Sequence, residues 1–118
     1  MKTIATFVLA AATVTLALPA AAQFAKPEDA IKYRKSALFV MQQNFGRVAA
    51  MAGGKAPFDP KVAAESAAVA EYMSKLPWAG FVEGTDKGDT KAKPEIWMDK
   101  AKFDDYAQKT QIELGKLN

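Results

Sequence analysis

The sequence contains no cysteine and no histidine among its 118 residues. Without cysteine, these residues cannot form a disulfide, a thiol nucleophile, a zinc ribbon or the C-x-x-C-H motif that attaches haem. Without histidine, they offer no imidazole metal ligand and no imidazole general base. Composition alone therefore points to no active site and to no metal-binding residues.

The length of the chain leaves room for one domain. Half of the residues are apolar and a quarter are charged, a balance typical of a folded protein rather than a disordered chain. The formal net charge is +3, and the charges alternate along the sequence. A nucleic-acid surface needs a concentrated basic stripe, so we expect no nucleic-acid partner.

Residues 1–22 resemble a secretory signal peptide. Lys2 gives a basic start, residues 4–18 are apolar, and Pro19 precedes a run of alanines that suits cleavage after Ala22. The alternative is an uncleaved anchor, but the apolar run of about 15 residues is shorter than the ~20 that span a bilayer. We therefore expect export to the periplasm and no membrane contact after cleavage.

The remaining residues, 23–118, predict an all-α fold with three long helices. Pro27 and the Asp59-Pro60 pair mark the first two starts, because proline suits the first helical position and aspartate caps the free N–H groups. Gly53 and Pro77 are the expected ends of these two helices. A third apolar stripe begins at Pro94 and is still running at Leu117. The predicted helices are thus 27–52, 60–76 and 94–117.

The connection over residues 77–93 is long, and loops of this length are often functional. Its three glycines, Gly80, Gly84 and Gly88, are spaced by four and match no phosphate-binding motif, so we interpret them as turn glycines. Trp78 and Phe81 are expected to anchor the connection to the helices.

One residue on the apolar seam of the first helix does not suit a plain core. Two heptad rows make up this seam: Ile31 and Leu38 lie in one, and Arg34 lies with Met41 in the other. Arg34 is either a cation whose head reaches solvent near the helix end, or a cation aimed at an anionic group inside the bundle. The residues alone leave both interpretations open.

Catalysis is disfavoured, and we predict that the protein is not an enzyme. The acidic pairs Glu28-Asp29 and Asp104-Asp105 are adjacent on helices, so their side chains diverge instead of meeting at one point. They are better explained as a helix-start signal and a solvated face.

Several segments, taken in this order, resemble cytochrome c′, a class II c-type cytochrome. In the first helix these are residues 23–30, the run Tyr33-Arg34-x-Ser36-Ala37-Leu38 and the triplet 45–47. In the connection they are Leu76-Pro77-Trp78-Ala79-x-Phe81, then 84–85, 88–89 and 94–97. The resemblance implies an up-down-up-down four-helix bundle, of which residues 23–118 supply three helices.

The resemblance also implies haem c as cofactor, attached through a C-x-x-C-H motif in a fourth helix. These residues contain neither the two cysteines nor the axial histidine. We expect a chain truncated before that helix, the alternative being a naturally haem-free homologue.

Site residues follow from the resemblance position by position. Leu38 corresponds to the distal residue over the iron, and Arg34 to a position near the haem propionates. Lys35 corresponds to a haem-contact position where close relatives often carry Gln, and Asp89 to the haem edge in the connection. Four further side chains are expected to line the pocket, each with an ordinary core role as the alternative: Met41, Trp78, Phe81 and Phe103.

The implied function is that of a periplasmic haem protein that transfers electrons or binds small gases such as NO or CO on an open apolar distal face. Redox proteins of the periplasm and a second copy of the chain are the expected macromolecular partners. The alternative is a haem-free helical-bundle fragment or binding module without redox activity.

Overall fold

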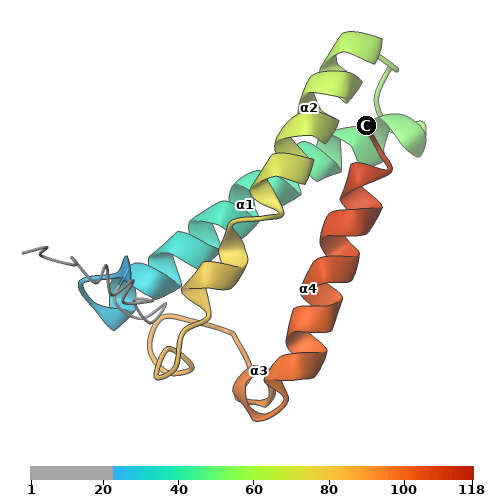
Figure 1. The fold of residues 1–118 in the computed structure, drawn as a ribbon. Helices are drawn as coiled ribbons and strands as arrows, with labels where there is room; N and C mark the ends of the chain where they lie inside the picture. Colours follow the sequence, from blue (N-terminus) through green and yellow to red (C-terminus); the bar gives the residue numbers. More distant parts are fainter. Residues whose placement is uncertain (1–22) are drawn as a thin grey trace, which may run out of the picture.

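The computed structural model describes residues 23–118, which form helices and no strand, so the all-α prediction is confirmed. The predicted signal peptide, residues 1–22, lies outside the described residues. Helix α1 spans Pro27–Ala52, α2 spans Pro60–Met73, the 3₁₀ helix η2 spans Pro77–Gly80, α3 spans Glu95–Met98 and α4 spans Lys100–Gly115. In Figure 1, α1 runs up, α2 returns beside it and α4 runs up again. No helix among the described residues is long and apolar enough to cross a bilayer.

The ends of α1 and the start of α2 follow local capping chemistry. Pro27 is the first residue of α1, and the acidic residues Glu28 and Asp29 follow it in the first turn. Gly53 follows the last residue of the helix, Ala52. The Asp59 side chain accepts hydrogen bonds from the backbone N–H groups of Lys61 and Val62, at 3.0 and 3.2 Å, before Pro60 opens α2. These three predicted boundaries are confirmed.

Helix α2 ends at Met73, three residues earlier than predicted. The Ser74 hydroxyl donates to the Glu71 carbonyl, and the Trp78 indole N–H donates to the Ser74 carbonyl. These local bonds satisfy carbonyls that a longer helix would have used and turn the chain into η2.

The single helix predicted over 94–117 is wrong in one respect, because the structure divides it at Asp99. The backbone of Asp99 leaves the helical region at φ −133° and ψ 67°, and its carboxylate accepts from the Lys102 N–H at 3.3 Å. It thus acts as the N-cap of α4. Before the break, the Trp97 indole N–H donates to the Val82 carbonyl at 3.1 Å, which ties α3 to the connection.

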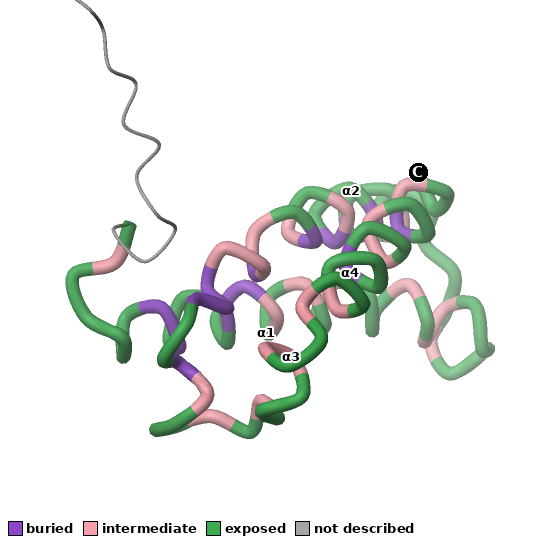
Figure 2. Tube along the Cα trace, turned by 60° about the horizontal axis from the view of Figure 1, so that its bottom comes forward, coloured by how far each residue is buried: buried purple, intermediate pink, exposed green. Residues whose placement is uncertain are grey.

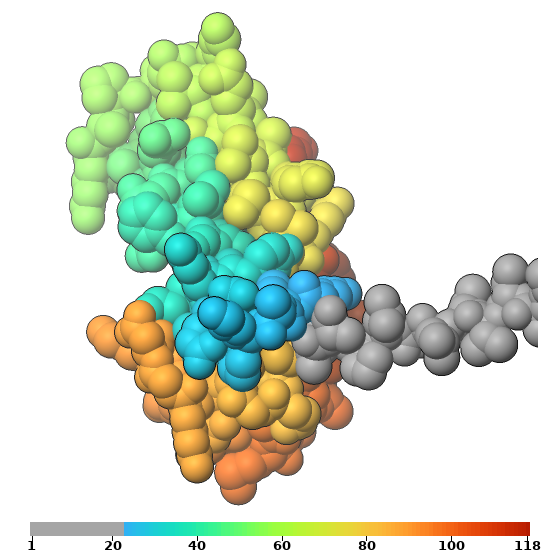
Figure 3. Space-filling model, turned by 90° about the vertical axis from the view of Figure 1, so that its left-hand side faces the viewer, coloured from blue at the N-terminus to red at the C-terminus, as the bar shows by residue number. Residues whose placement is uncertain are grey.

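The core lies where α1, α2 and η2 meet, as the purple segments of Figure 2 show. Its apolar members are small on the α2 side, Ala67 and Ala70, which lets α2 approach α1 closely. The buried end of α1 carries Ile31 and Arg34, and both pack under the connection that follows η2, residues 81–94: Ile31 lies beside Gly88, and Arg34 binds Thr85. Figure 3 shows the blue start of α1 lying against the gold and orange residues of this connection. The fold thus places the connection directly beside the seam of α1.

Candidate functional site

A cavity of about 850 Å³ lies between the seam of α1 and the connection, and we call it the loop cavity. Its walls combine apolar side chains with three cations and one carboxylate, so its lining carries a net positive charge. The lining residues are Arg34, Lys35, Leu38, Phe39, Gln42, Phe81, Gly88, Asp89, Thr90, Lys91, Ala92 and Ile96. Five of the eight predicted site residues are therefore brought together here.

Arg34 forms the inner wall of the loop cavity and is almost fully buried, with 1% of its surface exposed. Its Nη1 donates to the Gly80 carbonyl at 3.0 Å and to Thr85 Oγ1 at 2.6 Å. Its Nη2 donates to the Thr85 carbonyl at 2.7 Å and to Thr90 Oγ1 at 2.8 Å. All four Nη–H groups are therefore used by neutral oxygens of η2 and the connection.

The surroundings of Arg34 explain how this charge is tolerated inside the protein. Its guanidinium carbon lies 4.8 Å from the centre of the Phe81 ring and 5.5 Å from that of Trp97, so two aromatic faces stabilise the cation. Burial lowers the pKa of the Arg34 guanidinium from its ordinary value, although the group remains charged at neutral pH. Of the two interpretations that the sequence left open, that of a cation whose head reaches solvent is wrong, because the side chain turns inward.

Gly80 permits the close approach that the Arg34 bonds need. A Cβ atom at this position would lie 2.7 Å from Arg34 Cβ and 2.8 Å from the Ala30 carbonyl oxygen. Gly80 is therefore not a turn glycine but a point where η2 touches α1. Gly84 and Gly88 do have positive φ angles, 82° and 118°, and the turn role predicted for them is confirmed.

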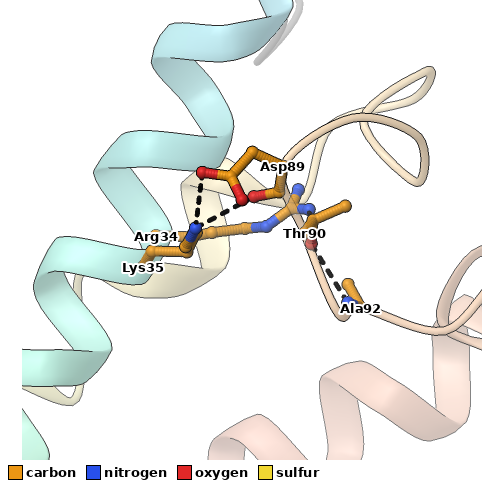
Figure 4. Close-up of polar contacts among 5 residues, drawn as sticks. All are labelled: Arg34, Lys35, Asp89, Thr90 and Ala92. Carbon is orange, nitrogen blue, oxygen red and sulfur yellow. Dashed lines mark hydrogen bonds and ion pairs between the residues drawn. The ribbon is translucent and has the colours of Figure 1, made fainter.

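Lys35 and Asp89 meet at the rim of the loop cavity. Lys35 Nζ donates to Asp89 Oδ2 and to the Asp89 carbonyl, both at 3.0 Å (Figure 4). The Asp89 side chain is 98% exposed, so solvent screens this ion pair. Two adjacent residues of α1 thus hold the connection, Arg34 from inside the protein and Lys35 from outside.

Trp78, Phe81 and Phe103 form an aromatic cluster behind the cavity wall. The rings of Phe81 and Phe103 have centroids 4.7 Å apart, and Trp78 lies 5.8 Å from Phe103 and 6.1 Å from Phe81. Of the three, only Phe81 lines the loop cavity. Trp78 and Phe103 lie in the layer that supports it.

Met41 lies apart from these residues. It lines a second cavity of about 500 Å³ between α1 and α4, together with Phe45, Tyr106 and Leu114. Leu38, one turn earlier, is half-buried and lines the loop cavity. The structure thus separates the two residues of the α1 seam into different cavities.

Thr85 and Thr90 were not predicted, although both bind the Arg34 guanidinium. Thr85 is fully buried, and its hydroxyl donates to the Val82 carbonyl at 2.6 Å while accepting from Arg34. Thr90 lines the loop cavity. There was one indirect signal for them in the sequence: Arg34 is a cation on an apolar seam, and such a cation needs hydrogen-bond acceptors if it is buried.

The lining of the loop cavity can be compared with what the haem implied by the resemblance would need. Leu38, Phe39, Phe81 and Ile96 give the loop cavity an apolar wall, and the cations at its rim suit carboxylate groups. These residues fit the face and edge of a porphyrin. Covalent attachment and axial imidazole ligation have no donor in the 118 residues.

Comparisons with known proteins agree with the geometry. The family model described as cytochrome c′ matches residues 29–118. A cytochrome c′ of Rubrivivax gelatinosus is 55% identical over 97 residues, which cover 81% of this chain and 75% of the relative. One from Alcaligenes xylosoxydans xylosoxydans is 47% identical over 96 residues, covering 81% and 74%.

Solved structures give the same result. The R. gelatinosus cytochrome c′ structure matches with a TM-score of 0.77 at 55% identity and covers 80% of this chain and 75% of that one. Cytochrome c′ from Shewanella frigidimarina matches with a TM-score of 0.76 at 43% identity and covers 78% and 72%.

Proposed function

Because this chain belongs to the cytochrome c′ family, whose members bind haem c, we propose that it is a periplasmic haem protein for electron transfer or for binding small gases such as NO and CO. The observation that supports this most is the loop cavity, which joins an apolar wall to a positively charged rim. When bound, the haem would supply the iron that exchanges an electron or takes up a gas molecule.

The residues of this chain have distinct tasks in this proposal. Leu38 and Phe81 keep the wall of the cavity apolar, which favours an uncharged diatomic ligand over water or an anion. Arg34 contributes a fixed positive charge at the inner wall, and Lys35 with Asp89 holds the rim of the connection. Trp78 and Phe103 support Phe81 from behind, and Met41 borders the bundle on the α4 side.

The proposal also covers the export of the protein, its partners and its oligomeric state. Residues 1–22 act as a cleaved export signal, and residues 23–118 are the haem-binding domain. The protein carries electrons or gas without being an enzyme, and it meets redox proteins of the periplasm. A homodimer would use α1 and α2, where Tyr33, Val40, Val62, Val69 and Tyr72 are exposed. Sedimentation of the purified protein measures this last point.

Titration of ferric haem into the purified chain tests the cavity directly. We expect a shifted Soret band that saturates at one haem per chain. Leu38→Asp should weaken binding about tenfold or more, because it places a carboxylate on the apolar wall. Leu117→Asp makes the same change at a side chain that is 44% exposed and lines none of the described cavities, so it should leave binding unchanged.

A second function, a haem-free binding module, is favoured by one observation: these residues contain no cysteine and no histidine. If haem gives no saturable Soret shift, or if the two Leu→Asp variants behave alike, the haem proposal is refuted and this second function is favoured.

A further inference from the structure

The methionines of the described residues differ in how far solvent reaches their side chains. Met98, the last residue of α3, is 80% exposed, the largest fraction among the exposed large apolar residues of this part of the chain. Met41, Met51 and Met73 are each half-buried. A dissolved oxidant must reach the thioether sulfur in order to react with it, so exposure separates Met98 from the other three.

The three half-buried methionines are protected by contacts inside the protein. Met51 Sδ accepts a hydrogen bond from the Asp59 backbone N–H at 3.5 Å, which occupies a lone pair of the sulfur. Met41 lines the cavity between α1 and α4, and Met73 lines one between α1 and α2, in both cases among apolar side chains. Their sulfurs are therefore less available to a dissolved oxidant than that of Met98.

The surroundings of Met98 leave its side chain accessible in the folded protein. It borders a hollow of about 440 Å³ at the junction of α3 and α4 (Figure 1), whose walls also include Lys102, Phe103 and Tyr106. None of the four residues of α3 is buried. A small peroxide can therefore reach the sulfur without any movement of the backbone, and a change at this side chain removes no core contact.

We propose that Met98 is an oxidation site of the folded protein, at which a peroxide converts the thioether to a sulfoxide. The sulfur donates an electron pair to one peroxide oxygen, the O–O bond breaks, and the second oxygen takes up the proton that the transferred oxygen releases. With hydrogen peroxide the products are methionine sulfoxide and water, so the sulfur loses two electrons and the peroxide gains them. This assignment does not depend on the proposed haem function.

The same exposure makes the modification reversible. A thiol-dependent methionine sulfoxide reductase returns the sulfur to the thioether, while two thiols become a disulfide and the oxygen leaves as water. Met98 reaches the active site of such an enzyme from the folded chain, whereas a sulfoxide between two helices does so only after the helices open. In the oxidised state, the surface at the end of α3 changes from apolar to polar.

Peptide mapping of the full chain by mass spectrometry after exposure to hydrogen peroxide tests this assignment. The oxidation rate of each methionine is divided by its rate in the same chain unfolded in urea, so that differences in neighbouring sequence cancel. We expect a ratio near one for Met98 and ratios about fivefold lower or less for Met41, Met51 and Met73. If Met98 reacted no faster than these three in the folded chain, the assignment would be overturned.

Met98→Leu keeps an apolar side chain of similar size and removes the sulfur. The first oxygen uptake of the folded chain should slow about fivefold or more, while the rates at the remaining methionines stay the same. Met73→Leu is the matched control, because it removes a half-buried sulfur and should leave the first oxygen uptake unchanged. Equal effects of the two substitutions would contradict the assignment.

Two measurements on the singly oxidised chain test whether the change occurs without unfolding and can be undone. The Tm should stay within about 3 °C of that of the unmodified chain, because the side chain is exposed. A pair of methionine sulfoxide reductases, one for each sulfoxide epimer, should restore Met98 with dithiothreitol as the thiol. A larger fall in Tm, or reduction only after unfolding in urea, would overturn the assignment, since Met98 would then be packed inside the protein.

Discussion

Gly80 determines how closely the connection can approach α1. A methyl group at this position would meet the Ala30 carbonyl oxygen at 2.8 Å and Arg34 Cβ at 2.7 Å, and backbone atoms cannot move aside as a flexible side chain can. Gly80→Ala should therefore destabilise the protein by about 1–3 kcal/mol, the usual cost of overpacking. Urea unfolding measures this change.

Gly46 provides the control for that substitution. It lies inside α1 with no atom near the position of a Cβ, so Gly46→Ala should raise the free energy of unfolding by about 0.5–1 kcal/mol. If the two variants changed stability in the same direction, the contact between η2 and α1 would not be as close as described.

Arg34 should be important for stability through its acceptors. In Arg34→Met, the buried oxygens of Gly80 and Thr85 would lose their donors, and we expect a loss of about 2–4 kcal/mol in chemical denaturation. Arg47→Met removes an exposed guanidinium whose one side-chain bond, to Asn44, is 3.5 Å long, so a change below about 0.5 kcal/mol is expected. Similar losses in both variants would contradict the buried role of Arg34.

At the scale of elements, Arg34 and Lys35 of α1 both bind the connection between η2 and α3, but the Lys35 contact is the weaker one because it is exposed. The Lys35–Asp89 pair is exposed, so a double-mutant cycle with Lys35→Met and Asp89→Asn should give a coupling of about 0.2–1 kcal/mol that falls at high salt. The same cycle on Lys61 and Glu65, at 3.8 Å within α2, is the comparison. A salt-independent coupling well above this range would show that the pair is shielded from solvent.

The sequence was sufficient for those parts of the fold that depend on neighbours along the chain. The helix starts at Pro27 and Pro60 were predictable because capping acts over a few residues. The break at Asp99 was missed because the apolar stripe continues through it, although aspartate is a good cap. The link from Arg34 to Thr85 and Thr90 spans more than fifty residues, and no local pattern contains that information.

In the candidate site, too, the residues could be named from the sequence, whereas their contacts with distant parts of the chain could not. The resemblance placed Leu38, Phe81 and Asp89 on one cavity, but it could not show that the Nη–H groups of Arg34 are already used by the connection. That fact depends on the conformation of residues 80–90, which follows from the glycines at 84 and 88 and from packing against α1.

At the scale of the whole molecule, α4 is the long helix with the fewest buried residues. Its buried residues are Ala107 and Leu114, while α1 and α2 share a continuous buried layer under η2. Few buried apolar contacts predict a low free energy of local opening. Hydrogen exchange should therefore show the amides of α4 opening before those of the first half of α1, and uniform exchange across the helices would contradict this order.

Leu114 and Ile112 test how α4 is attached. Leu114 is 7% exposed, so Leu114→Ala should cost about 2–3 kcal/mol and accelerate exchange in α4, since it removes its largest buried side chain. Ile112 is 59% exposed on the same helix, and Ile112→Ala should cost less than about 0.5 kcal/mol. Because both substitutions truncate a branched aliphatic residue in one helix, only burial separates them. Equal costs would mean that α4 does not pack through Leu114, and the arrangement of the three long helices would need revision.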